Sequence, residues 1–351
     1  MKILLLTGEL TEKHGWGRYS IGLLGALSSA GVEVVVAQGL PNPLNYKKNY
    51  FLAFLYAMRL KNQAKDCDVI HSLLEPYSYI SYLLSLLTGK KYFITVHGTY
   101  GVLPYNFPFY KKYFHKKSFE NAEKIICVSN YTRKRMEEFG LSNLEVINNG
   151  INFKNFSKLE VLPLENREDA IVSVGALKQR KGYHISISAF AEVLKVFGNI
   201  KYYIVGDQSD INYFNSLKKL VSDLNIEKSV VFLQSISDDE LLGLYGKSKL
   251  FVLTSVNEGA HFEGFGLVYL EANARGLPVI GSLDSGAEDA IRDGETGFLV
   301  PQNGVSAVTK AVIKILENKN LTITMKENSQ KWAKDHNWKR VIDNYINLYK
   351  T

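Results

Sequence analysis

The chain has 351 residues, 46% of them hydrophobic and 22% charged, a composition that is typical of a globular protein and argues against disorder. Domains usually have about 100–200 residues, so this length predicts two domains. The longest uncharged apolar stretch, residues 77–88, is shorter than the roughly 20 residues of a membrane helix, and the N-terminal apolar run is too short for a secretory signal. We therefore expect a cytoplasmic protein.

In the first half of the chain, short β-rich runs alternate with helical patterns, as in a parallel sheet covered by helices. The predicted strands are 2–6, 32–37, 69–71, 92–96, 125–128 and 144–147. The predicted helices are 18–30, 51–64, 79–87, 111–121 and 132–139.

The alternation then begins again after a charged segment without clear periodicity, residues 153–169, which we interpret as a linker. The strands predicted next are 171–174, 201–205, 230–233, 250–253 and 278–281. The helices predicted next are 183–196, 210–224, 238–247, 266–275 and 304–317, followed by a last helix over 338–349. Two such series predict two doubly wound α/β domains. Their ligands are expected beyond the carboxyl ends of the strands.

Neither cysteine points to a metal site. Cys67 and Cys127 each adjoin a strand-like run, and no histidine cluster lies at ligand spacing. The sequence Asp66-Cys67-Asp68 resembles a metal-binding Asp-x-Asp, but it precedes a strand instead of following one. We expect buried thiols and no required metal.

The most informative stretch is residues 263–271, Glu-Gly-Phe-Gly-Leu-Val-Tyr-Leu-Glu, which leads from a predicted strand into a predicted helix. Glu263 lies on the loop, whereas Glu271 lies about one and a half turns inside the helix. Free amides at a helix start bind anions such as a diphosphate. Those amides belong to Gly266, Leu267 and Val268.

This stretch resembles the glutamate–seven–glutamate motif of the retaining family 4 glycosyltransferases, which have the GT-B fold. Further segments resemble that family in order along nearly the whole chain. They are Ile94-Thr95-Val96-His97-Gly98, Cys127-Val128-Ser129, Ile147-Asn148-Asn149-Gly150, the segment 174–182 (Val-Gly-Ala-Leu-Lys-Gln-Arg-Lys-Gly), Gly206-Asp207 and the segment 293–300 (Asp-Gly-Glu-Thr-Gly-Phe-Leu-Val). The resemblance implies two Rossmann-like domains facing across a cleft. We place them at 1–155 with the C-terminal helix 336–351 (acceptor side) and at 156–335 (nucleotide-sugar side).

On the second domain the resemblance implies a donor site. Lys181 would neutralise the leaving diphosphate with help from Arg180, Glu263 would bond hydroxyls of the transferred sugar, and Glu271 would bond the ribose. The family usually has Arg where this chain has Ala176.

On the first domain the resemblance implies that His97, at the end of a strand, contacts the transferred sugar. It also implies that the loop with Gly15 and Gly17 touches the β-phosphate and the acceptor. Trp16 and Tyr19 either stack on a sugar ring or pack in the protein.

The resemblance therefore implies a retaining glycosyltransferase that moves a hexose from GDP-mannose or a UDP-hexose to a glycan or lipid-linked acceptor, with no other cofactor. No close pair of carboxylates suggests a double displacement, so we expect attack on the same face as the leaving group. One alternative is a non-catalytic GT-B binding or scaffolding subunit, which would not hydrolyse a nucleotide sugar. Another is a sugar-nucleotide epimerase, whose motifs differ from these. A nicotinamide dehydrogenase is not expected, since Gly15-Trp16-Gly17 lacks a third glycine three residues on.

The net charge of +7 is unevenly distributed, because residues 1–155 carry 19 Lys and Arg against 11 Asp and Glu, whereas the rest carries 23 against 24. An anionic membrane is one partner that fits the basic half, and a solvated basic face is the alternative. Much of the excess lies in the pairs Lys47 and Lys48, Lys90 and Lys91, Lys111 and Lys112, Lys116 and Lys117, and in the triplet Arg133-Lys134-Arg135. The chain would then lie peripherally on the inner face of the plasma membrane. Nucleic acid is not expected, since no binding motif accompanies the charge.

Overall fold

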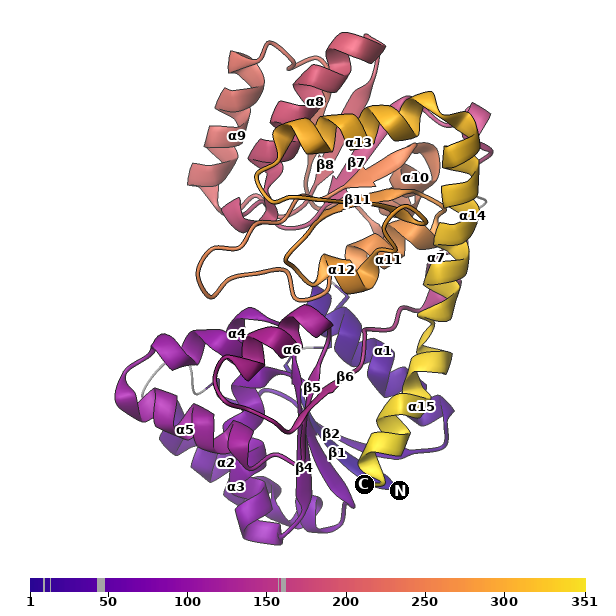
Figure 1. Ribbon diagram of the computed structural model, residues 1–351. Helices are drawn as coiled ribbons and strands as arrows, with labels where there is room; N and C mark the ends of the chain where they lie inside the picture. Colours follow the sequence, from indigo (N-terminus) through magenta and orange to yellow (C-terminus); the bar gives the residue numbers. More distant parts are fainter. Residues whose placement is uncertain (9, 13, 43–47, 157, 159–161) are drawn as a thin grey trace. The chain divides into compact units, whose positions relative to one another are not determined.

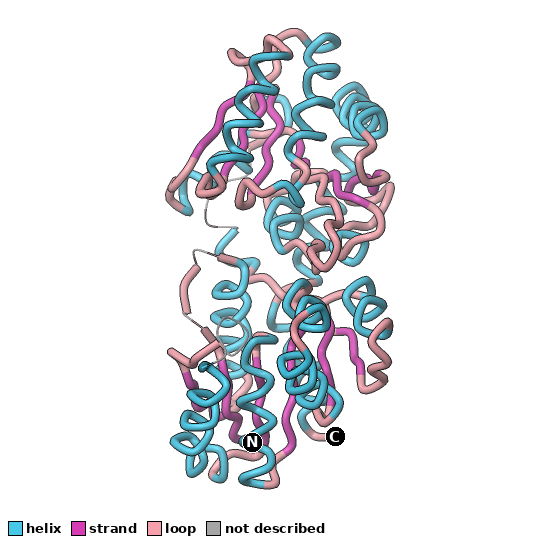
Figure 2. Tube along the Cα trace, turned by 90° about the vertical axis from the view of Figure 1, so that its left-hand side faces the viewer, coloured by secondary structure: helices cyan, strands magenta, loops and turns pink. Residues whose placement is uncertain are grey.

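The computed structural model describes residues 1–351 except 9, 13, 43–47, 157 and 159–161. The described chain divides into two compact units, Met1–Gly150 with Asn337–Thr351 (unit 1) and Ile151–His336 (unit 2). Both chain ends belong to unit 1 (Figures 1 and 2). No helix among the described residues combines the length and the apolar character that crossing a bilayer requires.

Unit 1 is a six-stranded sheet in the order β2-β1-β3-β4-β5-β6, counted over its described residues, in which every neighbouring pair is parallel. Buried apolar runs form these strands because a sheet covered on both faces offers no polar side. The strands are β1 Lys2–Leu6, β2 Glu33–Ala37, β3 Val69–Ser72, β4 Lys91–Val96, β5 Lys124–Cys127 and β6 Leu144–Val146. The helices are α1 Gly15–Ser29, α2 Lys48–Lys65, α3 Ser78–Thr88, α4 Thr99–Val102, α5 Phe109–Glu120, α6 Asn130–Glu137 and α15 Trp338–Tyr349.

Unit 2 repeats the architecture in the order β12-β11-β10-β7-β8-β9, again parallel throughout the described strands. Its strands are β7 Ala170–Val174, β8 Lys201–Val205, β9 Val230–Leu233, β10 Leu250–Val252, β11 Val279–Ser282 and β12 Gly297–Val300. Its helices are α7 Phe153–Phe156, α8 Tyr183–Phe197, α9 Ile211–Asp223, α10 Asp238–Lys247, α11 Leu267–Ala274, α12 Ala287–Ala290, α13 Val305–Glu317 and α14 Lys319–Asp335. Helices lie on both faces of each sheet (Figure 2), which confirms the predicted fold class.

Four of these elements of unit 2 were not predicted, namely the short helices α7 and α12, the strand β12 and the helix α14. Strand β12 pairs with β11 at one edge of the sheet, and its sequence had been interpreted only as a motif. The 17-residue helix α14 escaped prediction because the side chains that it buries are mostly polar or small. They are Thr322, Met325, Ser329 and Ala333.

Helix α15 at the end of the chain is held on unit 1 by a buried polar network. The His71 ring bonds the Tyr349 hydroxyl at 2.6 Å through Nδ1 and the Thr95 hydroxyl at 2.9 Å through Nε2. The Tyr19 hydroxyl joins Thr95 to Tyr345 at 2.9 and 3.1 Å. Burial lowers the pKa of His71 to about 3, so the ring is neutral at physiological pH. The terminal helix is thereby part of the unit 1 core.

Glu160 of the expected linker, 153–169, lies outside the described residues, whereas Arg167 makes defined contacts within unit 2. Arg167 is 5% exposed, and its guanidinium donates to the carbonyls of Ser248 and Arg275, each at 3.1 Å. Backbone carbonyls of unit 2 therefore satisfy this charge of the predicted linker in place of water.

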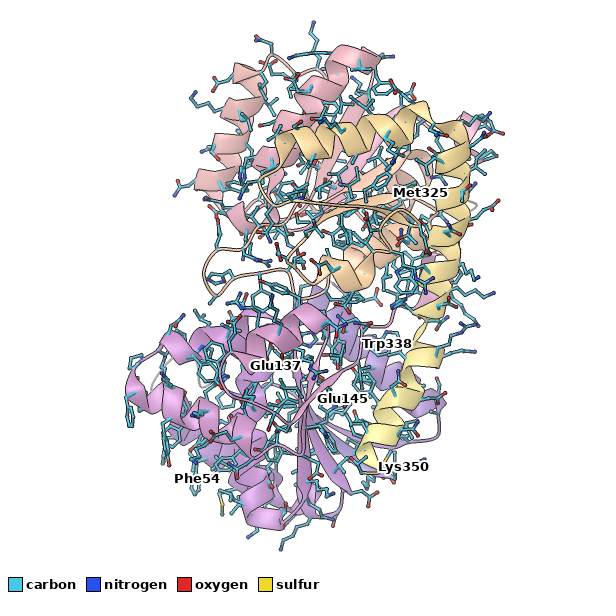
Figure 3. The ribbon with its side chains drawn as sticks, in the orientation of Figure 1. Phe54, Glu137, Glu145, Met325, Trp338 and Lys350 are labelled. Atoms are coloured by element: carbon cyan, nitrogen blue, oxygen red, sulfur yellow. The ribbon has the colours of Figure 1, made fainter. Side chains whose placement is uncertain are left out.

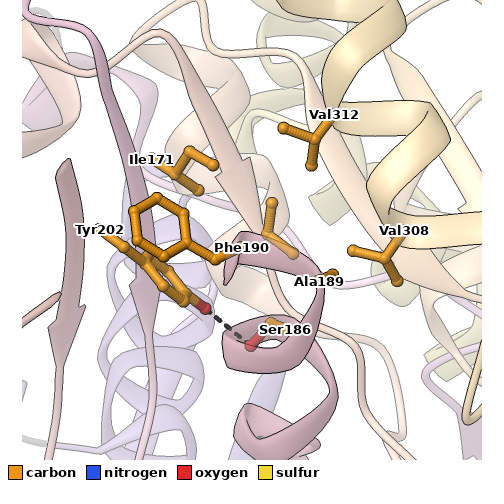
Figure 4. A pocket seen from close by; sticks show the side chains of 8 residues that line it. Ile171, Ser186, Ala189, Phe190, Tyr202, Val308 and Val312 are labelled. Carbon is orange, nitrogen blue, oxygen red and sulfur yellow. Dashed lines mark hydrogen bonds between the residues drawn. The ribbon is translucent and has the colours of Figure 1, made fainter. Parts of the chain in front are cut away.

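A cavity of about 10 Å³ lies inside unit 2 between β7, β8, α8 and α13 (Figure 4). Tyr202 donates to Ser186 at 2.8 Å on its wall, and the remaining lining is apolar. It is about large enough for a single water, so we interpret it as a packing void and not as a ligand site.

Candidate donor and sugar sites

In unit 2 the strand order reverses between β7 and β10, and such a switch point is where open α/β sheets bind their ligands. The loop after β7 carries Arg180 and Lys181, and the loop after β10 carries Glu263. The topology therefore brings Glu263 next to Arg180 and Lys181, although Glu263 lies 82 positions after Lys181 in the sequence.

These three residues form a buried ion cluster. The Lys181 ammonium donates to the Glu263 carboxylate, and the side chains are only 12% and 10% exposed. Ser255 donates to the same carboxylate oxygen at 3.0 Å, and the Arg180 guanidinium lies 4.0 Å from it. Two cations, of which the Arg180 side chain is the more exposed at 28%, thus converge on one carboxylate.

Burial lowers the pKa of the Lys181 ammonium below its ordinary value, and Glu263 offsets part of that shift. Burial alone would raise the pKa of the Glu263 carboxyl, but Lys181 and Arg180 outweigh it and hold the pKa below its usual range. Each partner thus favours the charged form of the other. An incoming anion that attracts Lys181 would leave Glu263 free to accept hydrogen bonds.

The backbone around Lys181 depends on Gly182. This residue has φ 68°, and a Cβ at its position would lie 1.9 Å from the Thr254 carbonyl oxygen. Only glycine allows the β7 and β10 loops to approach this closely, which is why Lys181 reaches Glu263.

Helix α11 begins at Leu267, after Gly266 in the left-handed region (φ 85°). A Cβ on Gly266 would collide with the Tyr269 ring at 2.5 Å and would lie 3.7 Å from Cγ of Glu263. Gly266, Leu267 and Val268 are partly exposed, so the helix start is accessible next to the ion cluster. Aligned amides at this point suit a diphosphate.

Glu271 is not part of the cluster. It is 3% exposed inside α11, and the Tyr245 hydroxyl lies 3.4 Å from its carboxylate. Ala176, where the family usually has Arg, is partly exposed after β7 and contributes no charge. Because the arginine is missing, Arg180 and Lys181 are the cations of this loop nearest to Glu263.

In unit 1 the order reverses between β1 and β3, and His97 directly follows the next strand, β4. Its Nε2 lies 2.9 Å from the Leu73 carbonyl oxygen, which can only accept, so Nε2 carries the proton. Burial lowers the pKa of His97 to about 4, and the ring is therefore neutral at pH 7. Nδ1 is then the acceptor nitrogen of the ring and can accept a hydrogen bond from a hydroxyl.

Sequence reasoning missed Glu75, which lies after β3 and is 1% exposed. One carboxylate oxygen accepts the amides of His97 at 2.7 Å and Gly98 at 3.1 Å, while the other, Oε2, has no partner among the described residues. Burial raises the pKa of Glu75 to about 7. Glu75 stands in no motif, so only the fold reveals that it holds the backbone of His97.

The structure places Gly15 and Gly17 in a helix and not in the predicted loop, whereas their contacts with the β-phosphate and the acceptor stay a prediction. Both residues belong to the first turn of α1, where Nδ1 of His14 accepts the Gly17 amide at 3.1 Å. Trp16 packs against Tyr100 with ring centroids 5.2 Å apart. Tyr19 is 1% exposed in the core, which excludes it as a sugar-stacking side chain in this structure.

No cluster of three metal-ligating side chains occurs in the part of the chain that the structure describes.

The sequence matches two families along its length. Residues 14–155 match Glycosyltransferase Family 4, and residues 156–332 match Glycosyl transferases group 1.

Similar curated proteins include an uncharacterized glycosyltransferase of Methanocaldococcus jannaschii, 24% identical over 90% of this chain and 85% of that protein. A GDP-mannose-dependent alpha-(1-6)-phosphatidylinositol monomannoside mannosyltransferase of Mycolicibacterium smegmatis is 31% identical over 62% of this chain and 59% of that protein. Among solved structures, Anabaena HepE in complex with UDP and glucose has 20% identity and a TM-score of 0.77, with both chains fully covered. A glycosyltransferase from Rickettsia africae has 22% identity and a TM-score of 0.80 over 99% of this chain and 97% of that chain. At these identities the solved structures support the fold alone.

Proposed function

Because the chain belongs to the group 1 glycosyltransferases with the GT-B fold, we propose that it is a retaining hexosyltransferase that uses a nucleotide-diphosphate sugar. The observation that carries this proposal is the buried Lys181–Glu263 pair beside the accessible start of α11. The cation and the aligned amides at this switch point suit the diphosphate of such a donor, and the carboxylate suits the hydroxyls of its sugar.

We assign the diphosphate to Lys181, Arg180 and the amides at the start of α11. When the donor binds, Lys181 turns from Glu263 to the phosphates, and Glu263 accepts hydroxyls of the transferred sugar. Preorganised charges of this kind stabilise the anion that develops on the leaving group, and loss of one costs roughly 10²–10³ in rate. Glu271 is assigned to the ribose and His97 of unit 1 to the transferred sugar.

The chemical step follows from these assignments. The bond between the anomeric carbon and the phosphate oxygen breaks, and the acceptor hydroxyl attacks the same face of the ring. Its proton passes to an oxygen of the departing diphosphate, so the configuration is retained. No protein nucleophile is needed, and we expect no metal.

The donor is GDP-mannose or a UDP-hexose, and the acceptor is a glycan or a lipid-linked sugar. The mycobacterial relative is named for GDP-mannose and a phosphatidylinositol mannoside, and Anabaena HepE was crystallised with UDP and glucose. These names support the two donor classes without choosing between them.

The test is release of free sugar from GDP-mannose and UDP-glucose by the purified protein without acceptor. Slow hydrolysis that depends on Lys181 and Glu263 would support the transferase. Absence of hydrolysis with both donors, together with binding of the nucleotide diphosphate, would favour a non-catalytic binding subunit.

A further inference from the structure

Helix α2 of unit 1 buries small side chains and exposes large apolar ones, the reverse of an ordinary amphipathic helix. The side chains that it turns toward the protein are mostly alanines, whereas its large apolar side chains face solvent. The buried positions are Ala53, Ala57, Leu60 and Ala64. The exposed ones are Phe51 (65%), Leu52 (36%), Phe54 (43%), Leu55 (45%) and Met58 (44%).

Four of these residues, Phe51, Phe54, Leu55 and Met58, have the i, i+3, i+4, i+7 spacing of one helix face. Normally such a stripe faces the core. Here it is left open, because alanine at the inner positions lets α2 pack closely on α3. Phe54 is labelled in Figure 3, and α2, α3 and α5 lie together in Figure 1.

Helix α5 continues this surface. Phe109 is 84% exposed and Tyr113 48% exposed, and Lys112 and Lys116 lie on the same exposed side of the helix. Tyr50 of α2 packs on Phe114 of α5 with ring centroids 5.3 Å apart, so the two helices adjoin. We call this surface the α2–α5 face. It comprises Phe51, Leu52, Phe54, Leu55, Met58, Phe109, Lys112, Tyr113 and Lys116.

The net charge of each of the two helices is positive. The sequence of α2 contains four Lys and Arg and no acidic residue, and that of α5 contains four Lys and one Glu. An exposed apolar stripe beside such charge fits a surface that is anionic outside and apolar beneath. A second copy of the chain fits poorly, because a symmetric contact would place this positive face against itself.

We propose that the α2–α5 face docks unit 1 on an anionic lipid bilayer, with Phe51, Phe54 and Leu55 inserted among the lipids and Lys112 and Lys116 at the headgroups. The docking accords with the lipid-linked acceptor of the proposed function, but the geometry that supports it is independent of catalysis. The sequence predicted membrane contact from the lysines alone. The exposed apolar stripe of α2 adds the side chains that insert among the lipids.

The experiment is co-sedimentation of the full chain with vesicles of phosphatidylcholine alone and with about one third phosphatidylglycerol. We expect binding to the anionic vesicles only. Phe54→Ser with Leu55→Ser should weaken the partition roughly 100-fold, about tenfold for each apolar side chain. Lys112→Gln with Lys116→Gln should weaken it roughly 25-fold, about fivefold for each lysine.

Matched controls come from exposed positions of unit 2. Val196→Ser with Ile211→Ser removes side chains that are 54% and 57% exposed, and Lys195→Gln with Lys219→Gln removes two exposed charges. Neither control should change vesicle binding. Thermal melting of each variant shows that it is folded.

Equal binding to neutral vesicles, or unchanged binding of both α2–α5 variants, would overturn the proposal. The proposal would also be overturned if wild type did not bind vesicles but formed a concentration-dependent dimer that Phe54→Ser with Leu55→Ser abolished. The α2–α5 face would then join two copies of the chain. Donor hydrolysis without vesicles is measured in parallel and should be unchanged in these variants. Its absence in wild type would refute the transferase while leaving the docking result intact.

Discussion

Replacement of the buried Glu75 by Gln should make the protein's stability less sensitive to pH. Gln keeps an oxygen that accepts the His97 and Gly98 amides, but it cannot ionise. In the folded protein burial raises the pKa of Glu75 to about 7 from an ordinary value of 4.5. That difference corresponds to about 3 kcal/mol at roughly 1.4 kcal/mol per pKa unit.

The sign follows from proton linkage. Below pH 4.5 the carboxyl is protonated in both the folded and the unfolded chain, so it does not reduce the free energy of unfolding. Between pH 4.5 and about 7 the unfolded chain releases the proton while the folded chain retains it, so wild type loses stability as pH rises. Above that range the loss is complete. The free energy of unfolding of Glu75→Gln relative to wild type should therefore increase by about 3 kcal/mol from pH 4.5 to pH 8.

The assay is urea-induced unfolding of both proteins over this pH range. Glu145→Gln is the matched control, because Glu145 lies on β6 of the same sheet (Figure 3) with an exposed side chain. Its stability should follow that of wild type at each pH. If the free energies of unfolding of Glu75→Gln and wild type changed in parallel with pH, the reasoning would be refuted, since ionisation of the buried carboxyl would not be linked to folding.

Glu75 also serves as a test of how His97 is held. Glu75→Leu removes the acceptor of two backbone amides, so we expect kcat to fall at least tenfold with KM for the donor nearly unchanged, whereas Glu75→Gln retains activity. An equal loss in both variants would show that the charge, and not the hydrogen bonds, matters.

Three further predictions concern the donor site. Lys181→Ala and Glu263→Ala should each lower kcat by about 10² or more, and each should destabilise the fold because it removes one partner of a buried ion pair. The double variant should regain melting temperature but not activity. Near-normal rates in either single variant would remove that residue from the mechanism. GDP or UDP at a hundred times its dissociation constant should stabilise the protein by about 2.7 kcal/mol in a thermal-shift assay, and no shift with either would argue against the nucleotide site. Activity should persist in EDTA, and its loss on chelation with recovery on adding Mg²⁺ would overturn the metal-free mechanism.

The sequence by itself determined the alternation of strands and helices in both units, because a strand buried on both faces must be a continuous apolar run. It also marked Lys181, Glu263 and His97, since each stands in a recognisable motif at the carboxyl end of a strand. Helix α14 could not be found in this way, because periodicity in hydrophobicity is absent when the buried stripe is mostly polar or small.

Tertiary structure alone decided where certain side chains lie. Tyr19 proved to be a core residue, Arg167 a buried donor to carbonyls, and Glu75 the acceptor behind His97, because each depends on partners far away in the sequence. The apolar stripe of α2 is the clearest case. Its pattern predicts an amphipathic helix, but only packing decides which side is turned inward, and close contact with α3 favoured the alanines.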